Sequence, residues 1–268
     1  MKKTRLLPTL FALAVALSLQ AQTASNPRAT FTDKAEARKS AVQCVMINGV
    51  CWATHNLAAH GVFVDNPEDF GALFQWGRRG DGHEQRNSTR YPTDNGEREN
   101  GTVSGAENFD ANGQIVSSHA AFGKFIKGNS GNLNWRDPHL NTLWNSGTES
   151  NPIKTANDPC PPGWRMPTNT ELNTLASLPS SQRVWTTNWN RTGVAGRVFG
   201  TAPNRLFLPA AGFRDHDDGV VFDEGSSGYY WSSTGYQSRA FFLFLLSSNV
   251  RSETLARANG HSVRCVSE

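Results

Sequence analysis

The 268-residue chain contains 24 glycines and 13 prolines, and only 18% of its residues are charged. Residues 1–21 hold three of the 26 basic residues and none of the 23 acidic ones, so the remainder carries equal numbers of both. Nucleic-acid binding needs a concentrated basic surface, which neither this balance nor any run of Lys and Arg supplies, so we expect no nucleic-acid partner.

The N-terminal residues predict a secretory signal peptide over 1–21. A short basic segment precedes an apolar stretch over 6–19, and Leu19-Gln20-Ala21 is a suitable cleavage site. The apolar stretch of about 14 residues is shorter than the roughly 20 that a membrane-spanning helix needs. No later apolar segment is longer, so we expect no transmembrane segment and an exported protein in the periplasm, at the cell surface or secreted.

A polar stretch separates the signal peptide from the folded part. Residues 22–42 are polar and mixed in charge, which indicates a linker or a short exposed helix. The segment 43–268 is long enough for one large β-rich domain or two small ones. Its eight tryptophans and many phenylalanines can supply a core in place of long aliphatic helices, because each ring buries a large area.

Four cysteines in an oxidising compartment predict two disulfides. Three pairings are possible. We favour Cys44–Cys51, whose partners are close in sequence, and Cys160–Cys265 in the C-terminal half. Neither pair has the C-x-x-C spacing of a redox or zinc site, so we expect both to be structural.

The first predicted element is a β-hairpin, with strands over 43–47 and 50–54 around an Asn48-Gly49 turn. A tight two-residue turn places Cys44 opposite Ala53 rather than Cys51. We therefore expect the short disulfide to require a bulge or a longer loop.

The middle of the chain predicts little regular structure. Residues 71–77 are a short strand with Phe74 and Trp76 on one face. The polar segment 78–114 predicts a long loop, and long loops in compact domains are functional or disordered. Residues 115–150 space aromatic anchors among polar residues, at Phe122, Phe125, Trp135 and Trp144.

The C-terminal half predicts more order. Thr168 and Glu171 form a capping box that begins a helix, and Pro179 limits its end. Residues 241–246 are apolar at every position, so we expect both faces of that strand to be covered. No internal repeat is visible. The predicted strands are 205–210, 228–232, 239–246 and 261–266.

Five segments are distinctive: INGVCWATHNL at 47–57, DPCPPGWRMPT at 158–168, LPAAGFR at 208–214, YWSST at 230–234 and SVRCV at 262–266. In this order they resemble the Fibrobacter succinogenes major paralogous domain, a family of exported bacterial proteins. The resemblance covers about residues 42–267, and so predicts a single domain over 43–268.

This resemblance implies an α+β, C-type-lectin-like fold with small twisted antiparallel sheets, one or two helices and long loops. It also implies a bridge from the C-terminal strand to the middle of the domain, where Cys265 and Cys160 lie. The Pro-Thr-x-x-Glu start of the predicted helix is similar to that of formylglycine-generating enzymes, which share the fold group. The family implies no defined activity.

The residues do not match the calcium-dependent sugar site of C-type lectins. That site uses Glu-Pro-Asn or Gln-Pro-Asp with a nearby Trp-Asn-Asp, whereas this chain has Trp231-Ser232-Ser233. The chain also contains an acidic cluster, which is a weaker candidate for a metal site. We consider Ca²⁺ there but favour a solvated turn, because the spacing of its acidic residues is not that of an EF-hand. We otherwise expect no cofactor. The cluster comprises Asp215, Asp217, Asp218, Asp223 and Glu224.

We expect no enzyme activity. The formylglycine reaction needs a reactive cysteine pair, and here both pairs are predicted to be bridges. Neither a Gly-x-Ser-x-Gly elbow nor a His-Glu-x-x-His helix is present, and the seven histidines are scattered. A glycosidase with two distant carboxylates leaves no local pattern, so an envelope hydrolase stays an alternative.

The leading hypothesis is an exported module that binds a glycan, a polypeptide or an envelope partner through its long-loop face. A structural subunit of a cell-surface assembly or adhesin is the other alternative. Aromatic faces and guanidinium groups at the border of the loop-rich middle are the predicted ligand contacts. They are Trp76, Arg78, Arg79, Trp135 and Trp144. The Trp and Arg residues inside the five family-like segments are expected to be structural.

Overall fold

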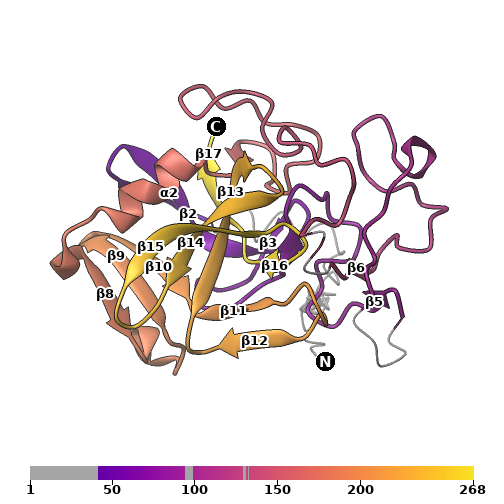
Figure 1. The fold of residues 1–268 in the computed structure, drawn as a ribbon. Helices are drawn as coiled ribbons and strands as arrows, with labels where there is room; N and C mark the ends of the chain where they lie inside the picture. The colour runs from indigo at the N-terminus through magenta and orange to yellow at the C-terminus, as the bar shows by residue number, and fades with distance from the viewer. Residues whose placement is uncertain (1–41, 94–98, 129–130, 132) are drawn as a thin grey trace, which may run out of the picture.

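The computed structural model describes residues 42–93, 99–128, 131 and 133–268 (Figure 1). The predicted signal peptide and all but the last residue of the predicted linker lie outside these residues. The architecture is α+β, with small sheets, one α-helix and long connections. The loops over 99–128 and 133–163 run along the right and the top of the view in Figure 1.

A five-stranded sheet joins the two ends of the described chain. Its order is β1-β2-β17-β7, with β3 paired to β2, and all of its neighbouring strands are antiparallel. The beginning of the fold is therefore hydrogen-bonded to its last strand. The strands are β1 (Cys44–Ile47), β2 (Val50–Ala59), β3 (Val62–Phe63), β7 (Trp164–Arg165) and β17 (Arg264–Ser267).

The β1–β2 hairpin has the predicted two-residue turn. Asn48 and Gly49 both have positive φ, at 48° and 80°, as the tight hairpin turn of this type requires. Cys44 pairs with Ala53 in the strand register, yet it forms the disulfide with Cys51, at a Cα–Cα distance of 5.3 Å. The pairing is confirmed, but the expected bulge was wrong, because the Cα atoms of these two diagonal neighbours approach within the range that a disulfide spans while the regular register is kept.

The second predicted disulfide, Cys160–Cys265, is also confirmed, with a Cα–Cα distance of 6.0 Å. It joins the loop before β7 to β17, and both of its cysteines are buried. The bridge therefore fixes the middle of the chain to the C-terminal strand.

A seven-stranded sheet forms most of the C-terminal half. Its order is β15-β14-β13-β11-β16-β4, with β12 paired to β11. The predicted strand over 71–77 is reduced to the two residues of β4. Strand β14 lies between two neighbours, and Phe242, Leu243 and Leu245 are buried while Phe241 and Phe244 are half-buried. The strands are β4 (Phe74–Gln75), β11 (Ala211–Arg214), β12 (Val221–Glu224), β13 (Gly228–Tyr236), β14 (Arg239–Leu245), β15 (Val250–Ala256) and β16 (Gly260–His261).

Two smaller sheets complete the strand structure. The first is three-stranded and antiparallel, with β9 in the centre, and the second pairs β5 with β6 in parallel. Short 3₁₀ turns lie at Ala106–Asn108 (η1), Ser180–Gln182 (η2) and Trp189–Arg191 (η3). The strands are β5 (Arg90–Tyr91), β6 (Phe125–Ile126), β8 (Arg183–Thr186), β9 (Gly196–Thr201) and β10 (Asn204–Pro209).

Helix α2 (Asn169–Ala176) begins where the capping box predicts. The Thr168 hydroxyl accepts from the Glu171 N–H at 3.2 Å, and the Glu171 carboxylate accepts from the Thr168 N–H at 2.8 Å. The helix ends at Ala176, and its C-cap Ser177 lies two residues before Pro179, the predicted limit. It lies against β13, β14 and β15, with Leu172 and Leu175 in the core (Figure 1).

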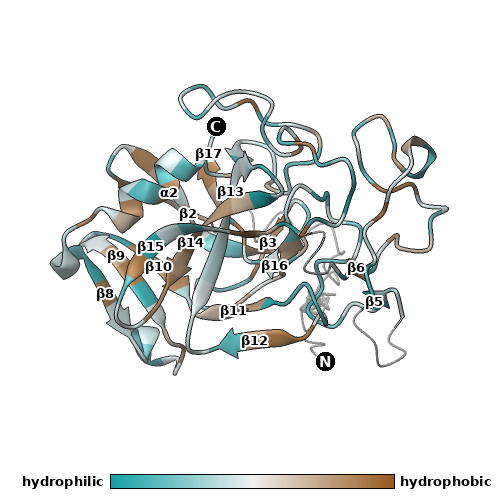
Figure 2. Ribbon diagram, in the orientation of Figure 1, coloured by the Kyte–Doolittle hydropathy of each residue, from teal (hydrophilic) through white to brown (hydrophobic). Residues whose placement is uncertain are grey.

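The buried side chains form two hydrophobic clusters. One lies between α2, β10, the start of β13 and the end of β14, and the other lies under the loop-rich middle and contains four tryptophans. Figure 2 shows hydrophobic stretches along β9, β10 and β14. The loop-rich middle therefore covers the second cluster, which is rich in aromatic side chains. Its tryptophans are Trp76, Trp135, Trp144 and Trp231.

Candidate functional site

Tryptophan side chains hold the backbone of residues 74–78 in place. Phe74 and Gln75 form β4, and the chain then turns through a bond from the Arg78 N–H to Gln75 O at 3.1 Å, with Gly77 at φ +83°. Three carbonyls of this segment each accept a hydrogen bond from an indole N–H: Trp231 Nε1 to Phe74 O at 2.8 Å, Trp135 Nε1 to Trp76 O at 2.7 Å and Trp144 Nε1 to Arg78 O at 3.2 Å. The indoles thus satisfy carbonyls of the short strand and of the turn that follows it.

These contacts correct the predicted ligand-binding set. Trp76, Trp135 and Trp144 are 0% exposed and Arg78 is 1% exposed, so none of the four offers a surface to a ligand. Their hydrogen-bond donors are already used within the core, by backbone carbonyls and, for Arg78, also by neighbouring side chains. Only Arg79 of this set reaches the surface, with 40% of its side chain exposed, 3.6 Å from a carboxylate oxygen of Asp110.

A buried polar network surrounds Arg78. Its guanidinium donates to Asp81 at 2.6 Å, and the other Asp81 oxygen lies 2.7 Å from Nδ1 of His83. The backbone N–H of Gln75 donates to Nε2 of His83 at 3.1 Å, so the proton of a neutral ring is on Nδ1. Burial lowers the pKa of His83. Burial would raise the pKa of Asp81, but the nearby Arg78 and His83 outweigh it and hold that pKa below its usual value.

The same network contains a possible set of metal ligands, since Asp81, His83 and Glu84 place donor atoms within 4.8 Å of one another. Both ring nitrogens of His83 are already engaged within the chain, however. The Glu84 carboxylate also accepts from the Gly82 N–H at 2.9 Å. The group is therefore a structural element of the loop.

The acidic cluster predicted as a weak metal candidate is divided by the fold. Asp215, Asp217 and Asp218 lie in the turn between β11 and β12, and the other two residues lie at the far end of β12. In the turn, two of the carboxylates accept backbone N–H bonds at 2.7 and 2.8 Å. At the far end, Asp223 accepts from the Tyr229 hydroxyl and Glu224 pairs with Arg86. The five residues therefore do not form one site, although Asp215, His216 and Asp217 in the turn place donor atoms within 4.8 Å of one another.

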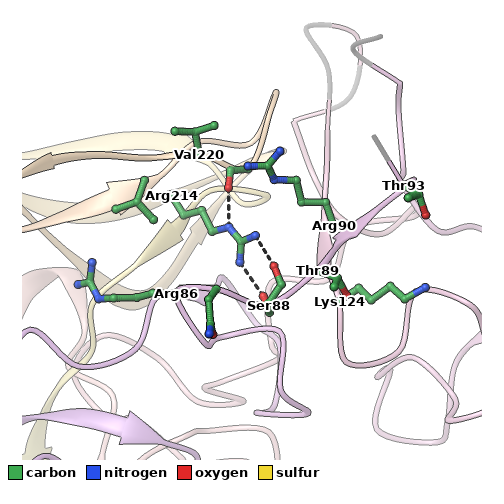
Figure 3. Close-up of a pocket in the computed structure, with 11 residues that line it drawn as sticks. Arg86, Ser88, Thr89, Arg90, Thr93, Lys124, Arg214 and Val220 are labelled. Atoms are coloured by element: carbon green, nitrogen blue, oxygen red, sulfur yellow. Dashed lines mark hydrogen bonds between the residues drawn. The ribbon is translucent and has the colours of Figure 1, made fainter. Parts of the chain in front are cut away.

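A cleft of about 560 Å³ lies between residues 86–93 and the turn of the β11–β12 hairpin. Figure 3 shows Arg214 in its centre, Arg90 reaching across above it, and Arg86 and Lys124 on opposite sides. No carboxylate is among the described lining residues. Four cationic side chains and three hydroxyls line the cleft, namely Arg86, Arg90, Lys124, Arg214, Ser88, Thr89 and Thr93.

Arg214 fixes the shape of this cleft. Its guanidinium donates to Gly219 O at 2.8 Å on the hairpin side and to the Ser88 hydroxyl and carbonyl at 2.6 and 2.7 Å on the loop side (Figure 3). It also lies over the Phe125 ring, 4.2 Å from the centroid. The side chain joins the two walls, so the cleft is a preformed feature. This is the structural role expected for the Arg of the LPAAGFR segment.

Arg86 and Lys124 differ in how they are held. Arg86 donates to Gly71 O at 2.7 Å and Ala211 O at 2.9 Å, and it pairs with Glu224 at 2.5 Å. The Lys124 ammonium has no hydrogen-bond or ion-pair partner within the described residues, and the residue is half-buried. Lys124 is therefore the lining cation whose donors are available to a ligand.

The sequence did not single out Arg86, Arg90 or Lys124. These residues come from separate segments, and each is an ordinary polar residue in its own surroundings. The β5–β6 pair brings Lys124 beside Arg90, and the bonds of Arg214 bring the hairpin beside both. Only the pairing of distant segments gives these residues a common site.

Two carboxylates are among the lining residues of another pocket, of about 340 Å³, which bears on the hydrolase alternative. Asp110 and Asp137 line it together with Arg136. Asp110 already accepts N–H bonds from Asn112 and Gln114, both at 2.9 Å, as a carboxylate in a tight turn does. These bonds give Asp110 a structural role that accounts for its position.

Comparisons with protein-family models, with curated proteins and with solved structures each found no match to this chain. The resemblance to the Fibrobacter succinogenes major paralogous domain stays a prediction based on the five segments. Among the described residues, no helix is long and apolar enough to cross a membrane.

Proposed function

We propose that this chain is an exported, non-catalytic binding module whose cleft takes an acidic ligand. The ligand class is a glycan or polypeptide that carries carboxylate or sulfate groups. The observation that carries the proposal is the lining of the cleft, which combines four cations and three hydroxyls and includes no described carboxylate. Such a surface attracts anions and orients them by hydrogen bonds.

The rigidity of the cleft favours binding. The Arg214 bonds to both walls hold the cleft open before a ligand arrives, so binding does not have to order them. At one side of the cleft, the Lys124 ammonium supplies a positive charge whose N–H donors have no partner within the described residues. Because the cleft is open to solvent, we expect affinity to fall as salt is added.

Export and the finer fold class are part of the same proposal. Two disulfides suit an oxidising compartment, and the N-terminal sequence has the pattern of a signal peptide. A C-type-lectin-like fold in the resembled family is supported by the Cys160–Cys265 bridge to the C-terminal strand, the small sheets and the single capped helix.

The test is binding of the oxidised mature chain to an array of acidic and neutral oligosaccharides and peptides, followed by titration calorimetry. We expect acidic probes to bind and their affinity to fall as salt is raised through the physiological range. The variant Lys124→Glu should bind acidic probes at least about tenfold more weakly. Arg239→Glu is the matched control, because Arg239 is an exposed cation on β14 that does not line the cleft.

The proposal would be refuted if no acidic probe bound, or if Lys124→Glu and Arg239→Glu lost affinity for acidic probes equally. Release of shorter products from a bound glycan would favour the hydrolase alternative instead. Concentration-dependent assembly without ligand binding would favour the structural subunit.

A further inference from the structure

The three-stranded sheet has one face in the core and one face toward solvent. Phe199, Leu206 and Leu208 belong to the core cluster. On the opposite face, the register places Val184 beside Val198 and Val198 beside Phe207, in one row across the three strands. Val184 is 52% exposed. The outer face therefore presents an apolar strip.

Trp189 covers one end of this strip. The η3 turn that follows β8 folds the indole back onto Phe207, with the ring centroids 4.6 Å apart and the planes only 2° from parallel. Phe207 is only 2% exposed beneath it. Because one face of the indole is on Phe207, the other face points away from the sheet.

The backbone of this turn is constrained. Asn190 and Arg191 are consecutive non-glycine residues with positive φ, at 46° and 66°. Such conformations are uncommon and concentrate where a site is preorganised. The turn is closed by a bond from Trp189 N to Val194 O at 3.0 Å and one from Gly193 N to the Asn188 side chain at 2.8 Å.

Trp189 and the strip form the walls of a pocket of about 400 Å³, within the size range of about 300–1,000 Å³ of ligand sites. Its polar residues are uncharged apart from one arginine, and no carboxylate is among the described lining residues. Several have side chains without a partner in the described part of the chain. These are Ser181, Asn190, Thr201 and Arg205.

This combination selects a ligand chemistry. A flat aromatic and aliphatic wall accepts the C–H face of a sugar ring, while amide and hydroxyl groups around it both donate and accept hydrogen bonds. A single cation lines this pocket, whereas four line the cleft near Lys124. We propose that the Trp189 pocket is a second binding site, which takes a neutral hexopyranose unit of a glycan. It goes beyond the proposed function and shares no lining residue with the cleft.

The experiment measures binding of cellohexaose, maltohexaose and mannohexaose to the oxidised mature chain by calorimetry and tryptophan fluorescence. We expect at least one hexamer to bind. Trp189→Ala should weaken it at least about tenfold and Asn190→Gly about three- to tenfold. Glycine keeps the left-handed backbone while it removes the amide, so Asn190→Gly tests the contact even if Trp189→Ala disturbs the turn.

Two controls separate this site from the acidic-ligand cleft and from a general change in tryptophan packing. Trp185→Phe alters the neighbouring tryptophan on the opposite face of β8 and should leave sugar affinity unchanged. Lys124→Glu should also leave it unchanged, so failure of the cleft proposal would not affect this result. The inference is overturned if no neutral hexamer binds, if Trp189→Ala and Asn190→Gly both bind as wild type does, or if sedimentation shows that the pocket mediates pairing of two copies of this chain.

Discussion

His261 provides a sensitive test of how the core is organised. It lies in β16 with no exposed surface, stacked on Trp231 at a centroid distance of 3.8 Å and in contact with the rings of Phe242 and Tyr229. Neither of its ring nitrogens has a hydrogen-bond partner in the described structure. Burial holds the pKa of His261 well below its ordinary value of 6.5, so the ring is neutral at pH 7.

The perturbation is His261→Phe. A buried donor or acceptor without a partner costs about 1–3 kcal/mol, and a phenyl ring of similar shape keeps the stacking on Trp231. We therefore expect the free energy of unfolding near neutral pH to rise by about 1–3 kcal/mol.

The pH dependence gives a second, independent result. As pH falls below about 6.5, the imidazole takes up a proton in the unfolded chain but not in the folded one, so stability is lost in acid. One such group contributes a slope of up to about 1.4 kcal/mol per pH unit, and the variant should lack it. His83 acts in the same direction, whereas burial raises the pKa of Asp158 to about 7 and so acts in the opposite one. The difference between wild type and variant isolates His261.

The assay is urea unfolding with the disulfides intact, from about pH 5 to about pH 7.5, followed by fluorescence and circular dichroism. His139→Gln, which removes a histidine at an exposed loop position, is the control. If His261→Phe lost stability near neutral pH while its acid slope matched that of wild type, the buried ring would have to be hydrogen-bonded, and the reasoning would fail.

The remaining predictions concern the disulfides, the indole bonds and one glycine. Replacing Cys160 and Cys265 by Ala should lower the free energy of unfolding by about 5 kcal/mol, because this bridge closes a loop of 105 residues. The same change at the hairpin bridge, which closes 7 residues, should lower it by about 2 kcal/mol. The reverse order in urea unfolding would contradict this. Trp135→Phe removes the donor to the buried Trp76 carbonyl and should lower the free energy of unfolding by about 1–3 kcal/mol. An unchanged midpoint in thermal or urea unfolding would show that the bond does not stabilise the fold. Gly212→Ala should prevent stable folding, as judged by yield and circular dichroism, because φ is +67° and the added carbon would lie 2.2 Å from the Phe222 carbonyl oxygen.

The fold could be predicted where its determinants are local. The capping box of α2 and the Asn-Gly turn of the first hairpin involve residues a few positions apart, and both were found where the sequence placed them. Strand β15 was missed, because its polar, alternating residues gain their strand character from pairing with β14. The two residues of β4 likewise pair with β16, from the opposite end of the domain.

The candidate site was less predictable for the same reason. A tryptophan in a loop-rich segment gives no local sign of whether its ring faces a ligand or its N–H meets a buried carbonyl. Here the acceptors lie 59 to 157 residues from the donors. The cleft cations are similarly distributed over the segments around 86–90, 124 and 214. Their charge identified a class of partner only after the fold had brought them together.

Irregular backbone explains why Trp and Arg are so often buried in this chain. A loop that packs into a core leaves carbonyls without strand partners, and Trp and Arg side chains carry donors only. Arg257 shows the pattern most clearly, since it is 0% exposed and donates to the carbonyls of Leu140, Gln237 and Arg239.

The same residue types that recognise ligands are therefore consumed in holding the loops, and composition alone cannot distinguish the two uses. What distinguishes them is whether the donors of a side chain are already engaged. By that criterion the indole N–H groups of Trp135 and Trp144 are unavailable, whereas the Lys124 ammonium in the cleft and the Asn190 amide beside Trp189 are free of partners within the described chain. Binding should therefore depend on these polar groups at the two pockets, and much less on the buried tryptophans that dominate the loop core.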